Sequence, residues 1–101
     1  MPDIYKYFGF VFLFYSNEHD PIHVHVQHDQ HESVFEIIMD NGVVKEIRSR
    51  DKRGVPPLPS KDLKIAEEFV RTYANNIVEK WVNFFIRKKR VVCTNVTKKL
   101  K

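Results

Sequence analysis

Five histidines fall within thirteen residues, from His19 to His31, and they are the side chains of this chain best suited to chemistry. Residues 22–27 (IHVHVQ) alternate apolar and polar side chains, a pattern typical of a β-strand. Same-face neighbours on a strand lie about 6.5–7 Å apart at Cα, so the imidazoles of His23 and His25 could converge on one ion or one anionic group.

Three roles for this pair are open. The first is a site for a divalent metal such as zinc, formed by His23, His25 and a third ligand. The third ligand we expect is His19, and the alternatives are Glu18, Asp20, His28 and His31. The second is acid–base cleavage of a phosphodiester by His23 and His25, with Arg48, or alternatively Arg50 or Arg53, stabilising the developing charge. The third, which we favour, is structural: the histidines shape the sheet face, and the chain is neither an enzyme nor a cofactor protein.

Charge is divided unevenly along the chain, whose formal net charge is +4. Residues 1–42 carry one lysine against seven acids, whereas residues 43–101 carry sixteen bases against six acids. This asymmetry favours an anionic partner, either nucleic acid or an acidic protein, and the alternative is a solvated tail without a partner. The candidate anion-binding residues are Arg50, Lys52, Arg53, Arg87, Lys88, Lys89 and Arg90.

The histidines need a sheet to position them. Residues 8–15 (FGFVFLFY) are apolar throughout, which predicts a central strand with its phenylalanines in the core. We expect helices to cover the phenylalanine side of this strand. The opposite side is then open, unless the second helical segment or the tail folds across it. The other side then presents a half-apolar surface for a partner protein or a second copy of the chain. Its predicted residues are Val11, Leu13, Tyr15, His23 and His25.

The remaining elements follow from turn residues and periodicity. Residues 40–42 (DNG) indicate a hairpin, with either a two-residue loop or, as we expect, a three-residue loop with a bulge that keeps Val43 and Ile47 on one face. Apolar residues recur every three or four positions over 61–88, which predicts two helices or one helix kinked at Asn75-Asn76. Residues 91–97 are rich in β-branched side chains and suit a short edge strand, here or in a second subunit.

Together these segments predict one α+β domain, because 101 residues are too few for two hydrophobic cores. A four-stranded antiparallel meander (8–48) packs on one or two C-terminal helices (61–88). A basic, proline-rich loop (49–60) joins them, and a basic tail or fifth, edge strand (89–101) follows. The chain shows no apolar run that could span a bilayer and no signal peptide, and its single cysteine suits a reducing compartment, so we expect a cytoplasmic protein.

The segment 15–26 (YSNEHDPIHVHV) resembles a family of small bacterial proteins known as domain of unknown function 4160. The shared motif is F-Y-x-N-E…P-x-H-x-H-V, preceded by an aromatic strand that opens with G-F and followed by a W-x-x-F-F-like segment, here residues 81–85. The likeness covers about residues 2–88. This chain departs from the family pattern in its longer, more basic loop at 49–60 and in its basic tail.

The resemblance implies no established activity. Members are often encoded beside another small protein, in a pairing that looks like a toxin–antitoxin module. We therefore expect an interaction protein that binds a partner protein, nucleic acid or both. A homodimer is a further alternative, and we expect no association with membranes.

Overall fold

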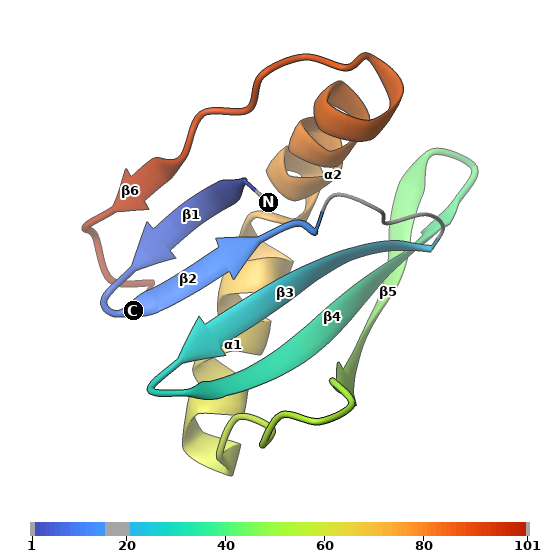
Figure 1. Ribbon diagram of the computed structural model, residues 1–101. Helices are drawn as coiled ribbons and strands as arrows, with labels where there is room; N and C mark the ends of the chain where they lie inside the picture. The colour runs from blue at the N-terminus through green and yellow to red at the C-terminus, as the bar shows by residue number, and fades with distance from the viewer. Residues whose placement is uncertain (1, 16–20, 101) are drawn as a thin grey trace.

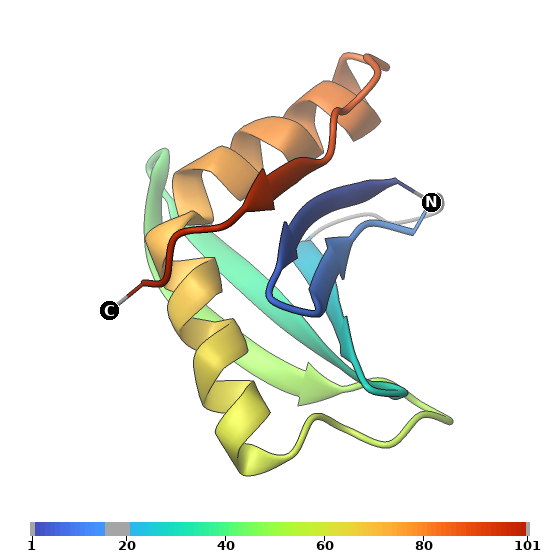
Figure 2. The same cartoon turned by 90° about the vertical axis from the view of Figure 1, so that its left-hand side faces the viewer.

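The structure is a computed structural model that describes residues 2–15 and 21–100. A six-stranded sheet in the order β5-β4-β3-β2-β1-β6 carries all of its helices on one face (Figures 1 and 2). The strands are β1 (Asp3–Tyr7), β2 (Phe10–Leu13), β3 (Ile22–His28), β4 (His31–Asp40), β5 (Val43–Asp51) and β6 (Thr94–Val96). The helical elements are α1 (Ser60–Thr72), α2 (Ala74–Trp81) and the π-helical turn η1 (Val82–Ile86).

The predicted α+β class is confirmed, but the prediction of a four-stranded meander is incomplete. Strands β2 to β5 form that antiparallel meander, and β1 adds an antiparallel strand beside β2. The apolar run 8–15 is not one strand, because Phe8 and Gly9 turn the chain with φ of 45° and 88°. The optional C-terminal strand is present as β6, which pairs in parallel with β1 at the sheet edge of the same chain.

The hairpin between β4 and β5 has a two-residue turn, so the expected three-residue loop is wrong. Asn41 and Gly42 both adopt positive φ, as a tight type I′ turn requires, and Asp40 pairs with Val43. A bulge lies further along the strand, between the pairs Ile38–Glu46 and Met39–Val44. Because of this bulge, Ile37 pairs with Ile47 as expected, whereas Val43 remains exposed.

The helical segment breaks at Tyr73, two residues before the predicted asparagines. Its apolar stripe packs on the phenylalanine side of the sheet, where the rings of Phe12 and Phe69 stack at 4.3 Å. Phe10, Phe12 and Phe14 are all buried, which confirms them as core, but the prediction is wrong for Phe8, which lies in the turn and is 53% exposed. None of the helices in residues 2–15 and 21–100 combines the length and apolar character that crossing a bilayer requires.

Candidate functional site

His23 and His25 stand side by side on the helix-free face of the sheet, with ring centroids 5.5 Å apart. Their neighbours Val24 and Val26 point into the core on the opposite face, as the alternation along β3 predicts. The Nδ1 atom of His23 lies 2.7 Å from the carbonyl oxygen of Pro21, so Nδ1 carries the proton and donates it. In the neutral ring the lone pair then belongs to Nε2.

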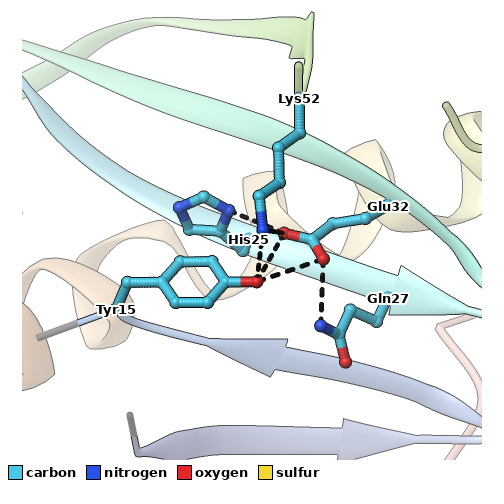
Figure 3. Close-up of polar contacts among 5 residues, drawn as sticks. All are labelled: Tyr15, His25, Gln27, Glu32 and Lys52. Atoms are coloured by element: carbon cyan, nitrogen blue, oxygen red, sulfur yellow. Dashed lines mark hydrogen bonds and ion pairs between the residues drawn. The ribbon is translucent and has the colours of Figure 1, made fainter. Parts of the chain in front are cut away.

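His25 is held by a buried carboxylate that the sequence did not single out. Its Nδ1 lies 2.9 Å from Oε2 of Glu32, and the two residues are only 6% and 4% exposed. The Nδ1–H donates to the carboxylate, which fixes the orientation of the ring. Glu32 also accepts hydrogen bonds from the Tyr15 hydroxyl at 2.9 Å and from Nε2 of Gln27 at 2.9 Å (Figure 3).

Lys52 completes this group, which we call the Glu32 cluster: Tyr15, His25, Gln27, Glu32 and Lys52. The Lys52 ammonium lies 3.2 Å from the Glu32 carboxylate and 2.7 Å from the Tyr15 hydroxyl oxygen, to which it donates. The Tyr15 ring in turn meets the His25 ring edge to face at 4.2 Å. Both carboxylate oxygens therefore accept hydrogen bonds from the cluster.

Four parts of the chain converge on the Glu32 cluster. Gln27 and Glu32 are direct partners across the β3–β4 ladder. Tyr15 follows the end of β2, and Lys52 follows the end of β5. The cluster therefore ties the hairpin to the chain that leaves β2 and to the first residue of the loop after β5.

The two central charges stabilise each other. Burial alone would raise the pKa of Glu32, but hydrogen bonds from Gln27, Tyr15, Lys52 and His25 outweigh it and hold the pKa below the usual value. The hydrogen bond to Tyr15 raises the pKa of Lys52, and Glu32 adds to that effect against a partial desolvation. At neutral pH the cluster is therefore an ionised carboxylate facing a protonated amine.

Metal binding gains no support from the described residues. In residues 2–15 and 21–100, no three side chains of histidine, cysteine, aspartate or glutamate are placed to hold a metal ion. The predicted third ligand, His19, lies outside the described residues. His23 and His25 are adjacent but engage Pro21 and Glu32 through Nδ1.

Comparison with known proteins gives one match. The model of a family described as Domain of unknown function (DUF4160) matches residues 9–82, about three quarters of the chain. The chain belongs to the DUF4160 family. No curated protein and no solved structure matches it. The match contains the whole Glu32 cluster and leaves out β1, β6 and the basic tail.

Two arginines of this DUF4160 protein on β5, Arg48 and Arg50, are neutralised by neighbouring carboxylates. Arg48 donates to Glu46 at 2.7 Å, and Arg50 donates to Glu36 at 2.9 Å. Glu36 also stands between His23 and Arg48 in one cross-strand row, since it pairs with both positions. A carboxylate at that point would repel a phosphodiester.

The bases after η1 are in a different situation. Arg87, Lys88, Lys89 and Arg90 are all exposed, and none of them forms an ion pair within the described part of the chain. Backbone hydrogen bonds from Arg87 to Val82 and from Lys89 to Asn83 hold this segment against the end of η1. We call these four residues the basic segment.

The two groups of predicted anion-binding residues do not form one surface. The end of β5 and the loop that follows it lie at the bottom of Figures 1 and 2, and the segment that follows η1 lies at the top of both views. Arg53 is exposed in the loop. The structure therefore separates the basic loop from the basic segment.

The predicted partner surface on the helix-free face is largely buried within the chain. Leu13 is 1% exposed and His23 is 7% exposed, while Val11 and Tyr15 are partly exposed. Val34, on the same face opposite His25, is fully buried. These residues offer a partner far less apolar surface than the sequence pattern alone indicates.

Sequence reasoning missed the roles of Gln27, Glu32 and the pair His28–Asp62. Gln27 and Glu32 share a sheet face if the turn at 29–30 has two residues, so the hairpin register was the signal that could have joined them. Asp62 lies 34 residues from His28 and comes to it only when α1 packs on the sheet. No local sequence pattern predicts the contact between His28 and Asp62.

Proposed function

We propose that this DUF4160 protein is an interaction protein, one component of a toxin–antitoxin-like pair, and that it binds an acidic surface of its partner protein through the basic segment. The support for the pairing is the family resemblance of residues 15–26. The support for the surface is physical: four adjacent cations stand exposed, without a counter-charge among the described residues.

The contrast between paired and unpaired cations carries this proposal. A cation that already holds a carboxylate must lose that contact before it can bind another anion, so Arg48, Arg50 and Lys52 are poor docking residues. Cations in the basic segment have no such contact to lose within the described chain. Their concentrated positive charge also accelerates encounter with an acidic partner.

The Glu32 cluster supports a structural role for the histidines over an enzymatic one. A carboxylate whose oxygens both accept internal hydrogen bonds has little capacity left to act as a base toward a substrate. The cluster instead fixes the helix-free face in one conformation. We therefore propose that the face serves as a rigid scaffold and that the partner protein binds elsewhere.

The test is co-expression of the chain with the product of the neighbouring gene, followed by purification through a tag on that product. Wild-type protein should be recovered with it. A variant with Arg87, Lys88, Lys89 and Arg90 all replaced by glutamine should be lost at moderate salt.

The matched control removes the same charge from scattered, exposed lysines: Lys6, Lys45, Lys61 and Lys64. This control should be recovered like the wild type. Equal recovery of both variants would contradict the role of the basic segment. If wild-type protein is no longer recovered after nuclease treatment, the basic segment binds nucleic acid and not an acidic protein.

A further inference from the structure

His28 is the one histidine among the described residues that a helix holds in place, on the helix side of the sheet. Its Nδ1 lies 3.1 Å from Oδ2 of Asp62 in the first turn of α1, and 3.7 Å from Oδ2 of Asp29. Its ring stacks on Phe10 with centroids 4.2 Å apart and planes inclined by 11°. Nδ1 is therefore the donating nitrogen, and in the neutral ring Nε2 is an acceptor of fixed direction.

Gly9 keeps the approach to this acceptor open. A Cβ atom at position 9 would stand 3.4 Å from both Nε2 and Cδ2 of His28, in the space in front of the ring. Nε2 of His28 makes no hydrogen bond to any residue in the described part of the chain. A side chain at position 9 would therefore come into van der Waals contact with the edge of the ring that carries Nε2.

A pocket of about 390 Å³ lies beside His28. Its wall includes Gly9, Gln27, His28, Asp29, His31 and Glu32, and no lysine or arginine among the described residues lines it. Nε2 of Gln27 donates to Glu32, which leaves the amide oxygen of Gln27 as an acceptor. Nδ1 of His31 is buried and has no hydrogen-bond partner in the described chain, so a polar group near it remains unsatisfied.

Strained backbone frames the same pocket. Five residues other than glycine have positive φ in the described chain, and three of them lie in the two hairpin turns beside His28: Phe8 at 45°, Asp29 at 49° and Gln30 at 66°. Such conformations cost on the order of 1 kcal/mol or more each, and they concentrate at functional sites. Asp29 and Gln30 form the two-residue turn of the β3–β4 hairpin, which uses positive φ at both positions, so Phe8 is the unusual residue of the three.

We propose that this pocket binds a small molecule bearing a protonated amine, with Nε2 of His28 accepting one of its N–H groups. The residues that line the pocket carry the acceptors that such a group needs: Nε2 of His28, the Gln27 amide oxygen and the Asp29 carboxylate. An ammonium group would also lie close to the Glu32 carboxylate, whose hydrogen bonds keep it ionised. An anion would meet carboxylates and no cation on this wall, so the charge selects amines over acids.

Three four-carbon probes of nearly equal size separate charge from shape: 1,4-diaminobutane, 1,4-butanediol and succinate. Binding is followed at pH 8 through the ring-proton NMR signals of the histidines in the full chain. The diamine should shift the His28 and His31 signals saturably, the diol at least tenfold more weakly, and succinate not at all. Equal responses to diamine and diol, or no saturable shift with the diamine, would overturn the proposal.

Gly9→Ala tests the open approach, because its Cβ would stand in front of the acceptor. The matched control is Gly54→Ala, which has the same backbone strain at φ of 84° but no atom within 4 Å of the new Cβ. Gly9→Ala should weaken diamine binding at least tenfold, while Gly54→Ala binds as wild type does. Equal binding by the two variants contradicts the site.

A second variant keeps the test independent of folding at position 9. His28→Asn retains an N–H donor near the place of Nδ1 for Asp62 but removes the Nε2 acceptor. It should fold and lose the diamine response at the His31 signal. A His28→Asn protein that still binds the diamine would overturn the assignment of Nε2.

Discussion

The helix-free sheet face and the basic segment both carry charged side chains, but they use them in opposite ways. On the face, Arg48, Arg50 and Lys52 each hold a carboxylate. The basic segment after η1 holds four cations with no ion pair in the described chain. Charges that are satisfied internally fix a conformation, and charges left unsatisfied at the surface are available to a partner. We propose that this difference separates the part of the molecule that supports the fold from the part that binds a partner.

The largest expected effect is on the buried carboxylate. Glu32→Gln should lower the free energy of unfolding by about 3 kcal/mol. The new amide N–H₂ would face hydrogen-bond donors, and Lys52 would lose its counter-charge. For a domain of this size that corresponds to a fall in Tm of more than about 10 °C. The control Glu46→Gln, in an exposed pair, should leave Tm close to that of the wild type. Equal Tm values for the two variants would contradict a stabilising Glu32 cluster.

Acid should release the same stabilisation. The folded state holds the pKa of Glu32 below the unfolded value, so its contribution is present at neutral pH and is lost as pH falls through the folded-state pKa. Urea unfolding measured from pH 7 to pH 3 should show the wild type losing stability more steeply than Glu32→Gln. Parallel curves for the two proteins would show that Glu32 is not the titrating group.

Removal of the ammonium should have a smaller effect. Lys52→Met leaves Glu32 with hydrogen bonds from Tyr15, His25 and Gln27, so we expect a loss of about 1 kcal/mol in the free energy of unfolding. Lys45→Met, at an exposed position on β5, is the control and should be neutral. A loss of stability as large as that of Glu32→Gln would assign the stabilisation to the ion pair alone.

The smallest effect is expected at the exposed pairs of β5. Arg48→Ala and Arg50→Ala should change neither Tm nor partner binding measurably, since exposed ion pairs contribute little. Thermal unfolding and the co-purification assay check both expectations. Weakened partner recovery in Arg50→Ala would extend the binding surface onto the sheet and blur the contrast between the two regions.

Periodicity predicted the elements of this fold better than their connections. The meander β2–β5, the amphipathic helices and the short C-terminal strand all follow from local patterns. Strand β1 was missed because the apolar run at 8–15 obscured the turn at Phe8-Gly9, where a bulky residue adopts a left-handed conformation. The β4–β5 loop was predicted wrongly because a bulge within the strand, and not at its turn, restores the register.

The site was predictable only in part, for a similar reason. Alternation alone places His23 and His25 together on one face. Their partners depend on long-range packing: Lys52 reaches Tyr15 across 37 residues, and the β3–β4 register brings Glu32 to Gln27. Burial of Leu13 and His23 likewise depends on the complete fold, so a sequence that suggested an open apolar face folds into a mostly covered one.

The salt dependence of partner binding tests the central contrast most directly. Affinity for the co-purified partner is measured from 50 to 300 mM salt for the wild type, the basic-segment variant and the scattered-lysine control. If the partner is nucleic acid, loss of four cationic contacts should lower the slope of log K against log salt by about 3, and an acidic protein should give a smaller change of the same sign. The control should keep the wild-type slope. A basic-segment variant with the wild-type slope and affinity would contradict the account.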